Sequence, residues 1–332
     1  MLNIAIVGVG NIGTRHAECY VANKKTKIVA VCDIIKEKAD KAAKKYDAKA
    51  FYSVKEMLAG GIQIDAASMC TKGAENGGDH YTPTMELLEG GIPTLGEKPI
   101  SNSITEAREM VALGKKKNVP YAIDLNHRFT PAAKRAREWL DAGRLGDLNI
   151  INMTMWINNK AETAPYFHIR ALHCHSFDVM RYFGGDVIKA QAFFKMGEGR
   201  KVCLSNVQAN VLFANGVIGH LTGSYDAGGS YGLETLEMVG SKGRVVINEA
   251  CQKLWFYPRN SMQVECYEML GNMLHFNETF ASRIGVWVDD LLAKTPPEQI
   301  NAKAEDALKV ALIIEACIES WEKDKVAVVA GI

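Results

Sequence analysis

Three glycines near the start of the chain restrict its fold more than any other feature. Gly8, Gly10 and Gly13 form the pattern GxGxxG, directly after the apolar run LNIAIV and directly before a helical pattern. In a strand–turn–helix unit the first glycine permits the tight turn, the second lets the backbone approach a pyrophosphate, and the third lets the helix pack on the strand. The N-terminus of that helix, at Asn11 and Ile12, would then face the phosphates. The sequence therefore predicts a dinucleotide-binding βαβ unit.

A carboxylate at the end of the second predicted strand completes this pattern. The run KIVAVCD ends at Asp33, twenty residues after Gly13. A carboxylate in this position accepts hydrogen bonds from ribose hydroxyls and repels a 2′-phosphate. We therefore expect the cofactor to be NAD rather than NADP.

Strand and helix patterns continue to alternate, which predicts a doubly wound parallel sheet, a Rossmann domain, for residues 1–123. In such a sheet ligands bind at the carboxyl ends of the strands. We expect four further cofactor contacts at those ends: Thr71, His80, Glu97 and Lys98.

From residue 124 the pattern changes, which predicts a second domain at 124–332. Thr130 and Pro131 are typical of a helix start. Several alternating runs follow, and Asn215-Gly216 between two of them indicates a hairpin. We predict an α+β domain with a mostly antiparallel open sheet, whose C-terminal segment can pack back on the first domain. The last two helices are expected at about 272–293 and 302–322.

Length and charge exclude several other classes. A chain of 332 residues exceeds what one hydrophobic core usually supports, in agreement with two domains. The formal net charge of +1 offers no basic surface for nucleic acid or a membrane, and no apolar run is long enough to span a bilayer. Because strand-like residues begin at once, no signal peptide is expected, and the cytoplasm is the expected compartment. The eight cysteines contain no CxxC pair and are expected as reduced thiols.

Longer segments resemble one family of enzymes. GEKPIS, NHRFTPAAKRAREWLDAGRLGDL, ETLEMVGSKGRVVIN and AEDALKVALIIEACIESWEKDKVAVV, together with the glycine pattern and Asp33, are similar to the glucose–fructose oxidoreductase / inositol dehydrogenase family. The resemblance implies that Lys98 reaches the nicotinamide ribose and the substrate hydroxyl, with Pro99 aiming it inward. It also implies a homodimer or homotetramer formed through the sheet of the second domain.

The stretch IRALHCHSFDVMRYFGG contains the candidate catalytic base. The family pattern here is Asp-x-Gly-x-His-x-x-Asp, and His175 and Asp178 match its His and its last Asp. Its first Asp falls on Ala171 and its Gly on His173. Oxidation of a carbinol needs a base near the hydroxyl and a cation that stabilises the alkoxide. The resemblance therefore implies His175 as the base, with Lys98 as its electrostatic partner and Asp178 in support.

Other interpretations of this stretch remain open in the sequence. A zinc site could draw on three histidines and one cysteine between residues 168 and 175, but their spacing is not a standard ligand pattern, so no metal is expected. The histidines could also be packed residues at a helix start. The resemblance and the residue types imply the following substrate-binding residues: Arg128, Trp156, Asn158, Tyr166, His168, His173 and Tyr225. A further substrate loop is expected at residues 224–234, with Tyr225, Asp226 and Tyr231.

These features together predict an NAD-dependent dehydrogenase. It would transfer a hydride between nicotinamide and a hydroxyl carbon of a sugar, an inositol-like polyol or a glycoside. One alternative is an enzyme that oxidises a glycoside transiently and cleaves it without net NADH. Another is a regulatory protein that binds nicotinamide or sugar but has lost catalysis, because the family carboxylate is missing at Ala171.

Overall fold

The computed structural model describes residues 1–227, 233–249, 253–268 and 277–331, and the chain divides into two compact units. Unit 1 comprises Met1–Leu125 and Phe280–Leu308, and unit 2 comprises Asn126–Thr279 and Lys309–Ile332. The first division therefore falls two residues beyond the expected end at residue 123. The later segment of unit 1 comes from the C-terminal part of the chain, for which the sequence allowed packing back on the first domain.

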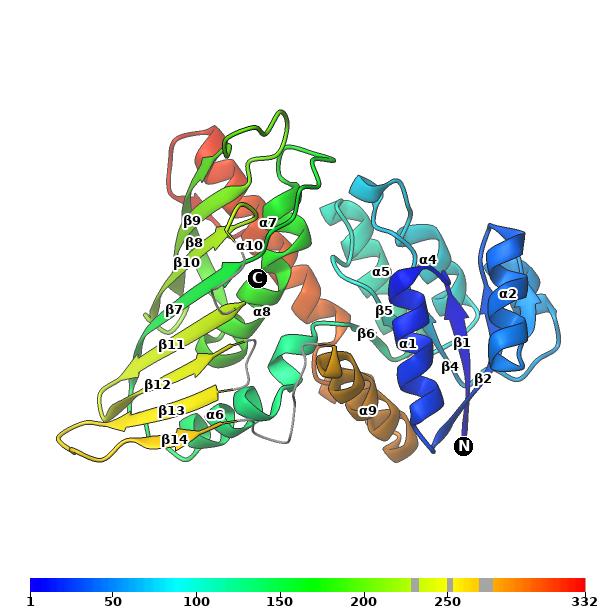
Figure 1. Cartoon of the computed structure of the whole chain (residues 1–332), viewed down its shortest axis with the longest axis horizontal. Coiled ribbons are helices and arrows are strands. Elements are labelled where there is room, and N and C mark those ends of the chain that lie inside the picture. The colour runs from blue at the N-terminus through cyan, green and yellow to red at the C-terminus, as the bar shows by residue number, and fades with distance from the viewer. Residues whose placement is uncertain (228–232, 250–252, 269–276, 332) are drawn as a thin grey trace. The chain divides into compact units, whose positions relative to one another are not determined.

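Unit 1 contains a six-stranded parallel sheet in the order β3-β2-β1-β4-β5-β6 (Figure 1). Its strands are β1 (Leu2–Val7), β2 (Thr26–Cys32), β3 (Lys49–Phe51), β4 (Ala66–Met69), β5 (Thr94–Gly96) and β6 (Tyr121–Ile123). The helices along the chain here are α1 (Asn11–Ala22), α2 (Lys36–Tyr46), α3 (Val54–Ala59), η1 (Ala74–Asn76), α4 (Tyr81–Glu89) and α5 (Ile104–Lys117). The strand order reverses between β1 and β4, which confirms the doubly wound sheet and puts the expected ligand crevice at the carboxyl ends of these two strands.

Helix α9 (Glu278–Ala293) contributes an apolar stripe to unit 1. Ile284, Trp287 and Val288 recur at the helical spacing of three and four residues, and each is at most 1% exposed. They share one core cluster with β1 side chains such as Ile4. This burial is the physical reason why a segment late in the sequence belongs with the first domain.

Unit 2 contains a nine-stranded sheet in the order β14-β13-β12-β11-β7-β10-β9-β8-β15. Its strands are β7 (Leu148–Trp156), β8 (Val187–Lys195), β9 (Asn206–Phe213), β10 (Ile218–Ser224), β11 (Glu234–Gly240), β12 (Gly243–Asn248), β13 (Lys253–Pro258), β14 (Glu265–Tyr267) and β15 (Ala327–Val328). Among the strands that the structure describes, β7 and β10 pair in parallel and the other neighbours are antiparallel, so the mostly antiparallel sheet is confirmed. Gly216, with φ of +88°, forms the expected turn between β9 and β10.

Helices cover one face of this sheet (Figure 1). They are α6 (Pro131–Asp141), α7 (Phe167–Ala171), α8 (His173–Gly184) and the later part of α10 (Ala304–Glu322). Helix α6 begins as expected, because the Thr130 hydroxyl accepts a hydrogen bond from the Ala133 amide at 3.2 Å and Pro131 follows the cap. The helix expected at about 272–293 would begin within residues 272–276, and these lie outside the described residues.

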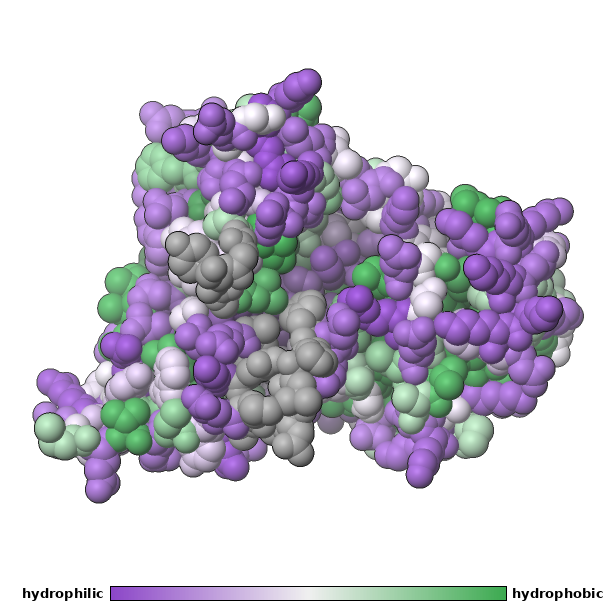
Figure 2. All heavy atoms as spheres, in the orientation of Figure 1, coloured by the Kyte–Doolittle hydropathy of each residue, from purple (hydrophilic) through white to green (hydrophobic). Residues whose placement is uncertain are grey.

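The visible surface is mostly hydrophilic. Figure 2 shows polar side chains over most of this face, with apolar side chains in small, separate groups. In the part of the chain that the structure describes, no helix combines the length and the apolar content that crossing a bilayer requires.

Candidate active site

The glycine pattern forms the turn between β1 and α1 in unit 1. Gly8 has φ of +83°, and a Cβ on it would lie 2.7 Å from the amide nitrogen of Thr71. A Cβ on Gly13 would lie 1.8 Å from the carbonyl oxygen of Gly8, so α1 approaches the turn closely only because Gly13 has no side chain. Gly10 is exposed, and a Cβ there would meet nothing within 4 Å. The free space at Gly10 is where the dinucleotide pattern requires the pyrophosphate.

The Asp33 carboxylate follows β2 and is oriented by backbone amides. Its Oδ2 accepts from the Val9 amide at 3.0 Å, and its Oδ1 accepts from the Ile35 amide at 2.9 Å. Each oxygen keeps a further lone pair for a ribose hydroxyl. Asn11 and Ile12 occupy the first two positions of α1, where backbone amides lack intrahelical partners. The predicted dinucleotide residues at the carboxyl ends of β1 and β2 therefore fit an NAD.

His80 joins two loops at the same end of the sheet. Its Nδ1 lies 2.8 Å from the Pro99 carbonyl oxygen, and its Nε2 lies 3.0 Å from the Thr71 carbonyl oxygen. The Thr71 hydroxyl donates to the Asp79 carbonyl oxygen at 2.6 Å. The ring therefore fixes the loop after β4 to the turn that carries Lys98. A direct contact of Thr71 or His80 with the cofactor stays a prediction.

Glu97 belongs to a buried cluster that the sequence analysis missed. His16 Nε2 lies 2.9 Å from Glu97 Oε1 and 3.1 Å from Asp124 Oδ2. All three residues are at most 6% exposed. Burial alone would lower the pKa of His16, but the Cys70 side chain and the two carboxyl groups raise it well above its usual value. His16 lies three residues after Gly13, on the face of α1 that packs on the sheet, and this spacing is the signal that could have identified it.

The two carboxyl groups of this cluster respond in opposite directions. Burial would raise the pKa of Glu97, but the hydrogen bond and the charge of His16 lower it. Burial raises the pKa of Asp124, and His16 offsets only part of that effect. Within the described residues these three form the one group of possible metal ligands that lie close together. The hydrogen bonds within the group hold the His16 imidazole between the two carboxyl groups.

In unit 2 the predicted support residue Asp178 is paired with Arg128. The Arg128 Nε donates to Asp178 Oδ2 at 2.7 Å, and its Nη2 donates to the other carboxylate oxygen. The two side chains are 5% and 1% exposed, and the guanidinium lies 5.2 Å from the centroid of the Tyr182 ring. Two parallel hydrogen bonds fix the plane of the carboxylate. Arg128, which the sequence predicts to bind substrate, is thus hydrogen-bonded to Asp178, which it predicts to support catalysis.

The predicted base His175 lies in the first turn of α8, one turn before Asp178. Its ring stacks on the His127 ring, with a centroid distance of 4.2 Å and an interplanar angle of 14°. His127 Nδ1 lies 2.5 Å from Glu234 Oε2. His127 belongs to η2 (Asn126–Phe129), beside Arg128, and Glu234 begins β11. The sequence analysis identified neither His127 nor Glu234.

Three predicted substrate residues, His168, His173 and Tyr225, form a buried cluster of rings. The two histidines approach through their Nε2 atoms at 3.0 Å, and the His168 and Tyr225 centroids are 4.4 Å apart. Burial lowers the pKa of His168 to about 3 and, together with His168, holds the pKa of His173 well below its usual value. A Cβ on Gly223 of β10 would lie 2.0 Å from His173 Nε2. These rings contribute to packing, and their contact with substrate stays a prediction.

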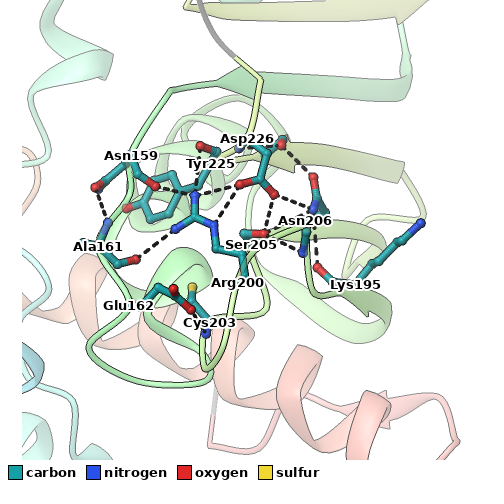
Figure 3. Close-up of polar contacts among 12 residues, drawn as sticks. Asn159, Ala161, Glu162, Lys195, Arg200, Cys203, Ser205, Asn206, Tyr225 and Asp226 are labelled. Carbon is teal, nitrogen blue, oxygen red and sulfur yellow. Dashed lines mark hydrogen bonds and ion pairs between the residues drawn. The ribbon is translucent and has the colours of Figure 1, made fainter.

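Arg200 connects three loops near Tyr225 (Figure 3). Its guanidinium donates to the Asn159 carbonyl oxygen at 2.5 Å, to the Ala161 carbonyl oxygen at 3.3 Å and to Asp226 Oδ1 at 2.7 Å. The other Asp226 oxygen accepts from Asn206 Nδ2 at 2.9 Å and from the Ser205 hydroxyl. Burial would raise the pKa of Asp226, but the hydrogen bonds from Ser205, Arg200 and Asn206 lower it. The sequence analysis named Asp226 in this group but not Arg200.

The remaining predicted substrate residues lie along the loop that follows β7. Trp156 ends that strand, and its amide donates to the Leu233 carbonyl oxygen at 2.9 Å. Asn158 forms an isolated bridge with Asp226. The Tyr166 hydroxyl donates to Glu322 Oε1 on α10 at 2.9 Å. Tyr231 lies outside the described residues.

Family comparison assigns both units. Residues 2–125 match the oxidoreductase family with an NAD-binding Rossmann fold, and residues 133–246 match the GFO/IDH/MocA C-terminal domain. The chain belongs to the GFO/IDH/MocA family. The resemblance inferred from the sequence is thereby confirmed, as is the assignment to the oxidoreductases.

Two curated relatives of this GFO/IDH/MocA protein are named as dehydrogenases of a glucoside and of an inositol. D-Glucoside 3-dehydrogenase of Escherichia coli (strain K12) is 29% identical over 150 residues, which cover 45% of this chain and 42% of that protein. Myo-inositol 2-dehydrogenase of Thermotoga maritima is 23% identical over 256 residues, 74% of each chain. The alignment thus spans less than half of the glucoside dehydrogenase.

Solved structures share the fold over nearly the whole chain. An oxidoreductase from Agrobacterium radiobacter, in complex with NAD+, L-tartaric acid and magnesium, has a TM-score of 0.88 at 17% identity, covering 99% of this chain and 98% of its own. Levoglucosan dehydrogenase in complex with NADH and levoglucosan has a TM-score of 0.86 at 19% identity, covering 99% and 100%. At these identities the likeness establishes the GFO/IDH/MocA fold.

Proposed function

We propose that this protein is an NAD-dependent dehydrogenase that acts on a carbinol carbon of a sugar, a polyol or a glycoside. The arrangement around His175 is the observation that carries the proposal. His175 stacks on His127 and lies one turn before Asp178, whose carboxylate is fixed by Arg128. Histidine is the side chain whose ordinary pKa suits proton transfer near neutral pH.

Each of the proposed residues has a separate role in alcohol oxidation. NAD, when bound, supplies the hydride acceptor. His175 takes the proton of the substrate hydroxyl, and Lys98 stabilises the negative charge that develops on its oxygen. The Arg128–Asp178 pair holds the first turns of α8 in place. Gly10 leaves space for the pyrophosphate and Asp33 binds the ribose.

The experiment that tests this function is a spectrophotometric assay of the purified protein. NAD and NADP are each mixed with a panel of inositols, aldoses and glycosides, and reduced nicotinamide is followed by absorbance. We expect turnover with NAD and at least one carbohydrate. Cleavage of a glycoside without net NADH would support the transient-oxidation alternative. Bound NAD without turnover on the whole panel would support the regulatory alternative.

Replacing the carboxylate of Asp33 tests the proposed preference for NAD. We expect Asp33→Asn to weaken NAD binding roughly tenfold and to narrow the discrimination against NADP, because the amide forms weaker hydrogen bonds with ribose and no longer repels a 2′-phosphate. Binding of each nucleotide by titration calorimetry measures the effect. Asp40→Asn on α2 is the matched control, since the Asp40 carboxylate accepts from the Tyr52 hydroxyl at the surface. Equal effects of both variants would contradict the role of Asp33.

We also propose that the protein forms a homodimer or homotetramer through the sheet of unit 2. The face of this sheet opposite the helices carries a groove of about 410 Å³ whose lining is mostly apolar. Ile218, on this face, is 54% exposed. Light scattering in solution should give a multiple of the 36.5 kDa monomer mass. A monomer mass at micromolar concentration would contradict this proposal.

A further inference from the structure

Two residues outside the sequence-predicted site surround the proposed base. The His127 and His175 rings lie nearly parallel, 4.2 Å apart, and the Nδ1 of His127 lies 2.5 Å from Glu234 Oε2. The three residues are 3%, 6% and 1% exposed. They come from three elements that are distant in sequence: η2, α8 and β11. A carboxylate, an imidazole hydrogen-bonded to it and a second imidazole stacked on the first therefore lie together in a buried part of unit 2.

We propose that His127 and Glu234 are positioning residues for His175: the ring of His127 fixes the plane of His175, and the Glu234 carboxylate balances the charge that His175 acquires with the substrate proton. This proposal rests on the proposed dehydrogenase function. In alcohol oxidation the O–H bond breaks and its proton moves to the His175 imidazole, while the carbon-bound hydrogen leaves with two electrons for NAD. The step turns a neutral ring into a cation, and a cation in a buried site needs an anion nearby.

The stacked geometry defines what His127 does. Nitrogens of two parallel rings point sideways and not at one another, so a face-to-face pair is not arranged for a direct hydrogen bond between them. His127 therefore acts by packing on His175 and by orienting the Glu234 carboxylate. Its hydrogen bond to Glu234 in turn fixes which way the His127 ring faces.

The other charged groups near His175 in unit 2 are already balanced. On the same helix, Asp178 forms a two-point ion pair with Arg128 from η2, so its charge is neutralised. On α7, Arg170 is paired with Glu315 at 2.8 Å. His168 and His173 are held neutral by burial.

The strands behind α8 add no further charge. Strand β7 contributes no charged residue, and His220 of β10 is bonded to Asn210 at 2.8 Å and Thr222 at 2.9 Å. Among the unit 2 groups that the structure describes around His175, Glu234 is the carboxylate that lies within hydrogen-bond distance of the histidine stacked on His175.

The test measures the titration of His175 directly, by NMR of the protein labelled with ¹⁵N-histidine, with His175→Asn used to assign its signal. We expect Glu234→Gln to lower the observed pKa of His175 by about one pH unit, because the imidazolium loses its anion. The acid limb of kcat for oxidation should move down by the same amount, and kcat on the plateau should fall about tenfold. The KM for the carbohydrate and the Kd of NAD should stay unchanged.

Two further variants keep the result decisive. Glu237→Gln makes the same change three residues along β11, where the carboxylate accepts from Asn152 at 2.9 Å, and should leave the His175 titration unchanged. If Glu234→Gln does not fold, His127→Phe combined with Glu234→Leu removes both polar groups together and keeps an aromatic ring on His175. This double variant should show the same shift.

The outcomes separate this proposal from the proposed function. A His175 titration that is identical in wild type and in the Glu234 variants overturns the positioning role, whether or not the enzyme turns over. Absence of turnover on every carbohydrate, with a shifted His175 titration, overturns the dehydrogenase function and leaves the electrostatic link intact. An equal shift in Glu237→Gln also overturns the proposal, because it would show a general effect of removing charge from β11.

Discussion

Replacing His175 with alanine should lower kcat for alcohol oxidation by about 10²- to 10⁴-fold, since the substrate hydroxyl would lose its general base. The Kd of NAD should remain within a factor of two of wild type, because the residues predicted to hold the dinucleotide are in unit 1 and His175 is in unit 2. Stopped-flow absorbance of NADH and fluorescence titration of NAD measure the two quantities separately. Added imidazole should restore part of the lost rate, because the truncated side chain leaves a space of matching chemistry.

Either of two results would contradict the role of His175. One is a kcat within threefold of wild type, which would assign proton transfer to another group. The other is a parallel loss of kcat and of NAD binding, which would indicate a structural defect. A thermal melt of the variant is the control, and we expect a modest change, because alanine removes the stack of the His175 ring on His127 and leaves the backbone of α8 in place.

Alanine at Gly13 should destabilise unit 1 by about 3 kcal/mol, since its Cβ would lie 1.8 Å from the Gly8 carbonyl oxygen and backbone atoms must move apart. Binding of NAD should be lost with it, because the turn between β1 and α1 shapes the predicted phosphate site. Thermal unfolding followed by circular dichroism measures the stability, and calorimetry measures the binding. A melting temperature equal to that of wild type would contradict the close approach of α1 to the turn.

Gly10→Ala is the matched variant in the same turn. A Cβ at Gly10 meets nothing within 4 Å, and its φ of −73° suits alanine, so the free energy of unfolding should change by less than about 0.5 kcal/mol. Binding of NAD should nevertheless weaken at least about tenfold, since the methyl group occupies space that the pyrophosphate approaches. Two alanines three residues apart thus separate folding from cofactor binding.

The sequence predicted the fold of unit 1 well because its signals are local. The glycine pattern, the buried run at Leu2–Val7 and the acidic residue after β2 each depend on neighbours in the chain. The sequence allowed the C-terminal segment to pack back on the first domain but did not identify helix α9 as the part that does so, because Trp287 packs in a core with distant residues such as Ile4 and Tyr20. Helical spacing predicts an apolar stripe, but it does not say which sheet the stripe covers.

Only some of the residues around His175 could be predicted from the sequence. His175 and Asp178 were identified from a short motif, while His127 and Glu234 lie 107 residues apart and meet only through the packing of η2 and β11. Arg128 was expected to contact substrate, but no spacing rule could pair it with Asp178, 50 residues away. Whether it also contacts substrate stays a prediction. The motif has no carboxylate at Ala171, and the sequence offered only its neighbours, such as His173, as replacements. Glu234 comes from β11, which is distant in sequence from this motif.

The Arg200 network has a consequence for altering substrate preference. One guanidinium bonds to carbonyl oxygens at Asn159 and Ala161 and to the Asp226 carboxylate, so segments from three parts of the chain share a single cation. Transplanting the segment that carries Arg200 from a relative would leave the other two without their common anchor, and transplanting either of those two would change one of its partners. A chimaera that changes specificity would therefore have to exchange the three segments as a block, with the arginine and its carboxylate taken from the same parent.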